Sequence, residues 1–292
     1  MLSLRVLHRN HTDMSRTFTC MGIVPVANRV VMDLEGEKDR SAQVLFVTIW
    51  ELGEAAGPLL IAPLSEIFGR YPVYNAANTL FIAATIMTAL SQDIGPLIFS
   101  RFLTGLAVAT NVLNPAIVGD LFPSDSRGSA MSAVMLAPLV GGAIGPTCAG
   151  AIAEITGWRE IMWICVGLAG VCEIMFITLF RETYKPSILY RRAKRVRRNT
   201  GDESYKTEYE IKDDSPIRTF AYGMIRPITV IWSSTLLQAL SIWGALVFSF
   251  FYIMSTTLPD MLEDIYGFGS GLTGVSFLTF SEFVLRVSIK IF

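Results

Sequence analysis

Long stretches of hydrophobic residues alternate with short polar segments along most of the chain. A helix of about 18 or more apolar residues is long enough to cross the hydrocarbon core of a membrane. Six stretches reach this length, at residues 42–64, 73–90, 95–118, 130–153, 161–180 and 227–258. They enclose few charges, namely Glu51, Glu54, Arg101 and Glu173. The pattern therefore predicts six complete membrane-spanning helices.

Shorter hydrophobic stretches lie near both ends of the chain. Residues 18–27 are apolar but too few to cross a membrane, and they lack the charged-then-apolar layout of a signal peptide. A seventh stretch begins at residue 268, but its later half contains Glu282, Arg286 and Lys290. We therefore expect an all-α fold, a polytopic membrane helical bundle with about six complete spans and partial first and last spans.

Composition agrees with a membrane protein and excludes several functions. The chain is 52% hydrophobic and 17% charged, and its 24 basic residues nearly balance its 25 acidic ones, which points to no nucleic-acid partner. The four cysteines, Cys20, Cys148, Cys165 and Cys172, have neither metal-ligand spacing nor a disulfide pattern. No phosphate-binding glycine loop, nucleophile motif or metal-binding motif occurs in the sequence. We expect no enzyme activity, no metal and no cofactor.

The basic residues are concentrated on one side of the predicted spans. Residues 181–226 contain 12 of the 24 Lys and Arg residues, and the turns with Arg70 and Arg127 lie on the same side. An excess of Lys and Arg marks the cytoplasmic face of a membrane protein. The predicted organisation is an N-terminal segment with the partial span, a first transmembrane bundle, a basic cytoplasmic central loop and the start of a second bundle, at residues 1–41, 42–180, 181–226 and 227–292 respectively.

The turn between the first two complete spans has a distinctive sequence, PLSEIFGRYPVY at residues 63–74. It resembles the loop Gly-x3-Asp-Arg/Lys-x-Gly-Arg-Arg/Lys that joins the second and third spans of the major facilitator superfamily. Glu66, Gly69 and Arg70 match that pattern, whereas Ala62 replaces its first glycine and Tyr71 its second basic residue. The resemblance implies that Glu66, Gly69 and Arg70 form a gating loop. The alternative is an ordinary cytoplasmic turn with solvated charges.

The stretch at residues 130–153 carries a small residue at nearly every fourth position, which lets helices approach closely within a membrane. Within it, GGAIGPTCAG resembles the fifth-span signature of the superfamily's drug:proton antiporter branch, matching at Gly141, Gly145, Pro146 and Gly150. The segment ETYKP at residues 182–186 is similar to the end of the sixth span in fungal multidrug members. A purely structural packing seam remains an alternative for the glycines.

Three charged residues inside the spans are candidates for proton coupling. Glu51 and Glu54 are three residues apart and share a helix face, where neighbouring carboxylates in a low dielectric tend to share a proton. Arg101 and the glycine four residues later match the superfamily's fourth-span pattern, in which the arginine is linked to proton coupling. The alternatives are a structural pair of acids and an arginine that extends to the outer interface.

Polar residues in other spans are candidates for lining a central cavity: Asn111, Asn114, Gln238, Trp243 and Tyr252. Each can instead form an ordinary hydrogen bond between helices. The resemblance implies a secondary active transporter that exports drugs or small organic molecules in exchange for protons, with membrane lipid as a further partner and no assigned oligomeric state. The alternatives are a uniporter or nutrient symporter of the same superfamily, or a truncated membrane protein that does not transport.

Counting from the resemblance, we expect a chain truncated at both ends, because the second bundle contains little more than one span. Carriers of this type bind substrate between two bundles and rock one bundle against the other. We therefore expect that the chain alone does not complete a transport cycle. The plasma membrane is the expected location, with the vacuolar membrane as the alternative.

Overall fold

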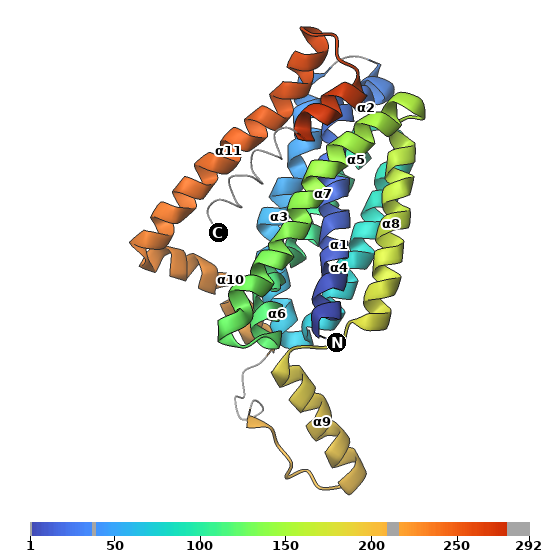
Figure 1. The fold of residues 1–292 in the computed structure, drawn as a ribbon. Helices are drawn as coiled ribbons and strands as arrows, with labels where there is room; N and C mark the ends of the chain where they lie inside the picture. The colour runs from blue at the N-terminus through green and yellow to red at the C-terminus, as the bar shows by residue number, and fades with distance from the viewer. Residues whose placement is uncertain (1, 37–38, 209–215, 279–292) are drawn as a thin grey trace.

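The computed structural model describes residues 2–36, 39–208 and 216–278, and Figure 1 shows its fold. Within these residues the chain contains helices and no strands. Six helical segments there are long and apolar enough to cross a membrane: Arg40–Phe68, Arg70–Leu90, Ile94–Leu121, Ser124–Ile155, Trp158–Leu179 and Thr235–Asp264. This confirms the predicted all-α bundle with six spans.

Two of these segments consist of shorter helices in succession. Helices α3 (Arg40–Phe68), α4 (Arg70–Leu90), α8 (Trp158–Leu179) and α11 (Thr235–Asp264) each form one span. The third span consists of α5 (Ile94–Val108), the 3-10 helix η2 (Ala109–Val112) and α6 (Leu113–Leu121). The fourth consists of the 3-10 helix η3 (Ser124–Ser126) and α7 (Arg127–Ile155).

The N-terminal segment differs from the partial span that hydropathy predicts. Helix α1 (Leu2–Gly22) leads through the 3-10 helix η1 (Val24–Val26) into α2 (Ala27–Glu35), so the described helix begins well before the apolar stretch at residues 18–27. Figure 1 shows α1 in the middle of the bundle, next to α7. Hydropathy misses this helix because its polar side chains are buried among other helices: Thr12, Asp13, Ser15, Arg16 and Thr19 are all at most 5% exposed.

The spans of the first bundle approach one another closely at glycines. Helices α3 and α5 are so near that a Cβ atom added at Gly105 would lie 1.8 Å from the carbonyl oxygen of Trp50. A Cβ atom added at Gly53 would lie 2.3 Å from the carbonyl oxygen of Phe102. Close approach of backbones replaces the hydrophobic driving force that is absent between helices in lipid.

The described part of the segment between α8 and α11 contains two helices. Helix α9 (Lys185–Thr200) projects from the end of the bundle at which α6 lies in Figure 1. Helix α10 (Pro216–Ser233) crosses the expected boundary between residues 226 and 227 and packs against α3, where a Cβ atom added at Gly223 would lie 2.8 Å from Cγ of Pro63. The predicted span at residues 227–258 therefore begins later, at Thr235.

Helix α11 contacts the first bundle mainly through its later half. Ser255 and Pro259 are its only residues classed as buried, and Figure 1 shows the start of the helix leaning away from the bundle. Residues 270–278 are also helical and pack on α7. Glu282, Arg286 and Lys290, which interrupt the predicted last span, lie outside the described residues.

The contact at Gly105 generates a stability prediction. Replacing Gly105 with Ala places a methyl group against the backbone of α3, and we expect a loss of about 1–3 kcal/mol in the free energy of unfolding. Gly167→Ala on α8 is the matched control, because a Cβ atom added there meets nothing within 4 Å. Thermal unfolding in detergent measures both variants. Equal melting temperatures for the two variants would contradict the packing described for α3 and α5.

Candidate functional site

The turn between α3 and α4 is built around a glycine and a distant carboxylate. Gly69 has a φ of 100°, a conformation that favours glycine, and a Cβ atom added there would lie 2.2 Å from Oε2 of Glu182. Glu182 follows α8, and its carboxylate accepts hydrogen bonds from the backbone N–H groups of Arg70 at 2.9 Å and Tyr71 at 3.3 Å. A carboxylate at this position stabilises the positive N-terminal end of α4.

The side chain of Arg70 is directed into the bundle instead of toward solvent. It donates a hydrogen bond to Ser65, lies 3.9 Å from a carboxylate oxygen of Asp120 and stacks 4.9 Å from the ring centroid of Tyr184. Glu66, the acid that matches the family pattern, is exposed. The structure therefore brings Gly69 and Arg70 together with Asp120 and Glu182 and leaves Glu66 at the surface.

A buried polar network, which the sequence analysis missed, lies in the middle of the first bundle. Its centre is the pair Asp13 and Arg16, one turn apart on α1, with side chains 0% and 1% exposed and 3.9 Å between their charged atoms. Asp13 accepts hydrogen bonds from the hydroxyl of Tyr74 at 2.8 Å and from Nδ2 of Asn114 at 3.1 Å. The network thus connects α1 with α4 and α6.

Arg16 extends the same network toward α8. Its guanidinium donates hydrogen bonds to Thr110 and Asn78, and Asn78 in turn donates to Glu173. The guanidinium also lies 5.0 Å from the centroid of the Tyr74 ring, within the range of a cation–π contact. Residues 12–19 have low hydropathy, as a buried polar helix does. A solvent-exposed segment has the same low hydropathy, so the sequence does not distinguish the two.

A mostly apolar cavity of about 450 Å³ lies between α1, α7, α11 and residues 270–278. Its lining includes Met21, Met135, Leu139, Phe248, Phe251, Tyr252 and Phe277. Tyr252 donates a hydrogen bond from its hydroxyl to Glu51 of α3, and Glu54 lies one turn further along that helix. The cavity therefore has an apolar wall and a tyrosine that connects it to a carboxylate.

Arg101 lies inside the protein, so it does not extend to the outer interface. Its side chain is 1% exposed and donates to the carbonyl oxygen of Cys20 at 3.0 Å. The guanidinium also lies 5.6 Å from the centroid of the Phe46 ring. Arg101 thus connects α5 with α1 and α3, and it makes no direct contact with Glu51 or Glu54 among the interactions of the described residues.

The glycines of the antiporter-like signature occupy close contacts of α7. A Cβ atom at Gly141 would lie 2.4 Å from the carbonyl oxygen of Met14, and one at Gly145 would lie 2.8 Å from that of Phe18. At Gly150 the nearest atom would be the carbonyl oxygen of Ser270, at 2.3 Å. Pro146 lines the apolar cavity. Helix packing accounts for the three glycines, and only the proline borders the cavity.

The five predicted cavity residues have different positions. Only Tyr252 lines the apolar cavity, while Asn114 is buried in the polar network and Asn111 is half-buried on η2. Trp243 is exposed and Gln238 is half-buried, and Gln238 donates to the carbonyl oxygens of Ile231 and Trp232 at 3.2 and 3.4 Å. Neither residue lines this cavity, because the helix breaks at Ser234 and the start of α11 leans away from the bundle; their assignment to a central cavity stays a prediction.

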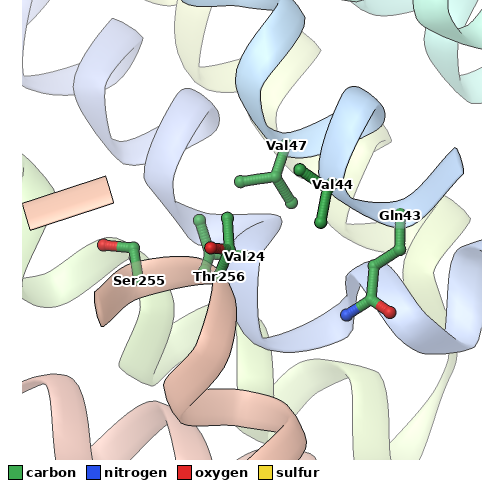
Figure 2. A pocket seen from close by; sticks show the side chains of 6 residues that line it. All are labelled: Val24, Gln43, Val44, Val47, Ser255 and Thr256. Atoms are coloured by element: carbon green, nitrogen blue, oxygen red, sulfur yellow. The ribbon is translucent and has the colours of Figure 1, made fainter. Parts of the chain in front are cut away.

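The later half of α11 closes against the first bundle. Six residues surround a narrow pocket there, and Figure 2 shows them: Val24, Gln43, Val44, Val47, Ser255 and Thr256. They leave no room for a water molecule. Nearby, Gln43 donates to Asp260 at 2.9 Å and Asn28 donates to Glu263 at 3.0 Å. Apolar packing and these two hydrogen bonds hold α11 to α2 and α3.

The described residues contain no group of three or more His, Cys, Asp or Glu side chains that could hold a metal ion. The four cysteines are free thiols. The arrangement offers an apolar cavity, carboxylates beside it and three buried arginines that connect helices, Arg16, Arg70 and Arg101.

Comparisons with known proteins agree with this architecture. The sequence profile of the Major Facilitator Superfamily matches residues 30–290. The chain is 34% identical over 239 residues to the efflux pump radE of Floropilus chiversii, covering 82% of this chain and 44% of that protein. It is 32% identical over 271 residues to the MFS-type transporter hepF of Aspergillus oryzae, covering 92% of this chain and 54% of that protein. The chain therefore spans about half the length of these relatives.

Solved structures show the same fold at low sequence identity. The chain is similar to a bacterial homolog of the human lysosomal transporter Spinster in an inward-facing, unoccupied conformation, with a TM-score of 0.70 and 15% identity. That match covers 94% of this chain and 58% of the other. It is also similar to the human organic anion transporter MFSD10, with a TM-score of 0.62 over 95% of this chain and 68% of the other.

The contacts of Glu182 at the start of α4 predict different effects on stability for substitutions of Glu182 and Glu66. Glu182→Gln removes the charge that accepts the amides of Arg70 and Tyr71, and we expect a loss of about 1–3 kcal/mol in stability. Glu66→Gln, the matched control on the exposed face, is expected to change stability by less than about 0.5 kcal/mol. Thermal unfolding gives the stabilities, and hydrogen exchange shows whether the first turn of α4 opens. A larger effect at Glu66 would refute the role of Glu182.

Proposed function

Because this chain belongs to the Major Facilitator Superfamily, we propose that it forms the first bundle and the start of the second bundle of a secondary active transporter. The transported molecules are drugs or other small organic compounds, exported in exchange for protons. The chain is an integral, multi-pass membrane protein. The plasma membrane is its proposed location, with the vacuolar membrane as the alternative.

The observation that carries the proposal is the apolar cavity beside Glu51. Small-molecule sites are mostly apolar cavities of about 300–1,000 Å³ with a few polar groups that orient the ligand, and the cavity of about 450 Å³ falls in this range. Because Tyr252 both lines the cavity and donates to Glu51, a substrate that displaces the tyrosine also changes the environment of the carboxylate. Substrate and proton can therefore affect each other's binding at this place.

Of the three candidate residues for proton coupling, two would exchange protons and one would position helices. Glu51 and Glu54 occupy one face of α3 and would hold or release a proton as access alternates. Arg101 would position α1 against α5 through the carbonyl oxygen of Cys20 as the bundle moves. The turn with Gly69 and Arg70 would act as the gating loop, with Glu182 and Asp120 as its partners.

The proposal of export is supported by the relatives, one of which is named an efflux pump. A uniporter or nutrient symporter of the same superfamily is the alternative transporter, and a membrane protein without transport activity is the alternative of another class. The direction of proton flux separates the first two, since exchange moves protons opposite to the substrate. The proposed partners are a small-molecule substrate, protons and membrane lipid.

Proton exchange is tested in vesicles that contain the protein expressed from its complete reading frame. With an imposed proton gradient, we expect addition of a transported compound from a drug panel to drive saturable proton movement in the opposite direction. Glu51→Gln is expected to abolish this movement because a glutamine side chain cannot release a proton. Tyr252→Phe is expected to weaken it, because the phenylalanine leaves Glu51 without its hydrogen bond.

Glu35→Gln, an exposed acid at the end of α2, is the matched control and is expected to retain proton movement. Substrate movement without protons would favour a uniporter, and proton movement in the same direction as the substrate would favour a symporter. Full activity of Glu51→Gln would contradict the assigned coupling group.

A further inference from the structure

Helix α9 has separate apolar and basic faces. Seven of its sixteen residues are basic: Lys185, Arg191, Arg192, Lys194, Arg195, Arg197 and Arg198. At helical spacing, Leu189, Ala193 and Val196 share one side, and most of the basic residues occupy the other. Leu189 and Val196 are 40% and 38% exposed, so no other part of the described chain covers the apolar side. Helices of this composition lie at membrane surfaces.

The basic face begins in a concave surface at the junction between α8 and α9. This surface encloses about 390 Å³ and is lined by Arg181, Glu182, Ile188, Arg191, Arg192 and Arg195. It contains four guanidinium groups and a single carboxylate. Arginine is suited to phosphate, because its planar group offers two parallel N–H donors.

The carboxylate of Glu182 is already occupied by other donors. It accepts hydrogen bonds from the backbone N–H groups of Arg70, Tyr71, Thr183 and Tyr184, at 2.9 to 3.3 Å. Its negative charge is therefore directed toward the start of α4. No ion pair within the described part of the chain neutralises Arg181, Arg191, Arg192 or Arg195.

The position of this surface relative to the membrane identifies its ligand. Helix α8 is a membrane span that ends at Leu179, so Arg181 lies two residues beyond the span, at the level of the lipid headgroups. We propose that the concave surface formed by Arg181, Arg191, Arg192 and Arg195 binds the phosphorylated headgroup of an anionic lipid in the cytoplasmic leaflet. This site does not depend on transport activity.

The test compares two pairs of substitutions on the same helix. Arg191→Gln with Arg195→Gln removes two charges from the concave surface, and Lys194→Gln with Arg198→Gln removes two charges from positions outside its lining. The full chain in detergent is titrated with a fluorescent short-chain phosphatidylinositol bisphosphate, and anisotropy gives the affinity. We expect the first pair to weaken binding about 30-fold, since each base near the surface contributes about 1 kcal/mol. We expect the second pair to weaken binding less than about threefold.

Further titrations separate the lipid from its soluble headgroup. Phosphatidylcholine of the same chain length should not compete, and free inositol trisphosphate should compete more weakly than the lipid, because it lacks the acyl chains that hold the lipid in the micelle beside the end of α8. Equal losses in the two pairs would overturn the site in favour of diffuse attraction along α9. Competition by inositol trisphosphate as strong as by the lipid would overturn the assignment to a lipid. Unchanged thermal unfolding of both pairs is the control for folding.

Discussion

The buried pair Asp13 and Arg16 is the interaction on which the arrangement of the first bundle depends. Removing two charges from water costs several kcal/mol for each ion, and only close partners offset this cost. Asp13 has Tyr74 and Asn114 as donors, while Arg16 donates to Asn78 and Thr110. Since these partners lie on α4, η2 and α6, the charges on α1 are satisfied only when those helices are in place. The polar network thus fixes one rotation of α1, which an apolar helix would not specify.

That rotation has consequences for the cavity. The face of α1 opposite the network contacts α7 through Gly141 and Gly145, and Thr17 and Met21 on α1 line the apolar cavity. A rotation of α1 would move these side chains and would separate Arg101 from the carbonyl oxygen of Cys20. The polar network, the glycine contacts and the cavity are therefore three parts of one arrangement around α1.

The sequence predicts the spans well because a long apolar stretch has few alternatives to a membrane helix. It also predicts the turn at Gly69 and Arg70, because a positive φ favours glycine and this glycine is part of a recognisable sequence motif. The burial of Asp13 and Arg16 could not be predicted, because a polar segment has the same composition in water and inside a bundle. Glu182 was missed as the partner of the turn because it lies 112 residues after Arg70 in the sequence. The assignment of Gln238 to a central cavity stays a prediction, and composition does not reveal the break in the helix at Ser234 that sets its position.

A double-mutant cycle on Asp13→Asn and Arg16→Gln, with unfolding measured in mixed micelles, tests the central claim most directly. If the buried pair organises the bundle, each single substitution lowers the free energy of unfolding by about 3–5 kcal/mol, because it leaves a buried charge without its partner. The double variant then loses less than the sum of the two, by about 1 kcal/mol or more. Two small and strictly additive losses would show that the pair is not coupled and that α1 is held by its glycine contacts alone.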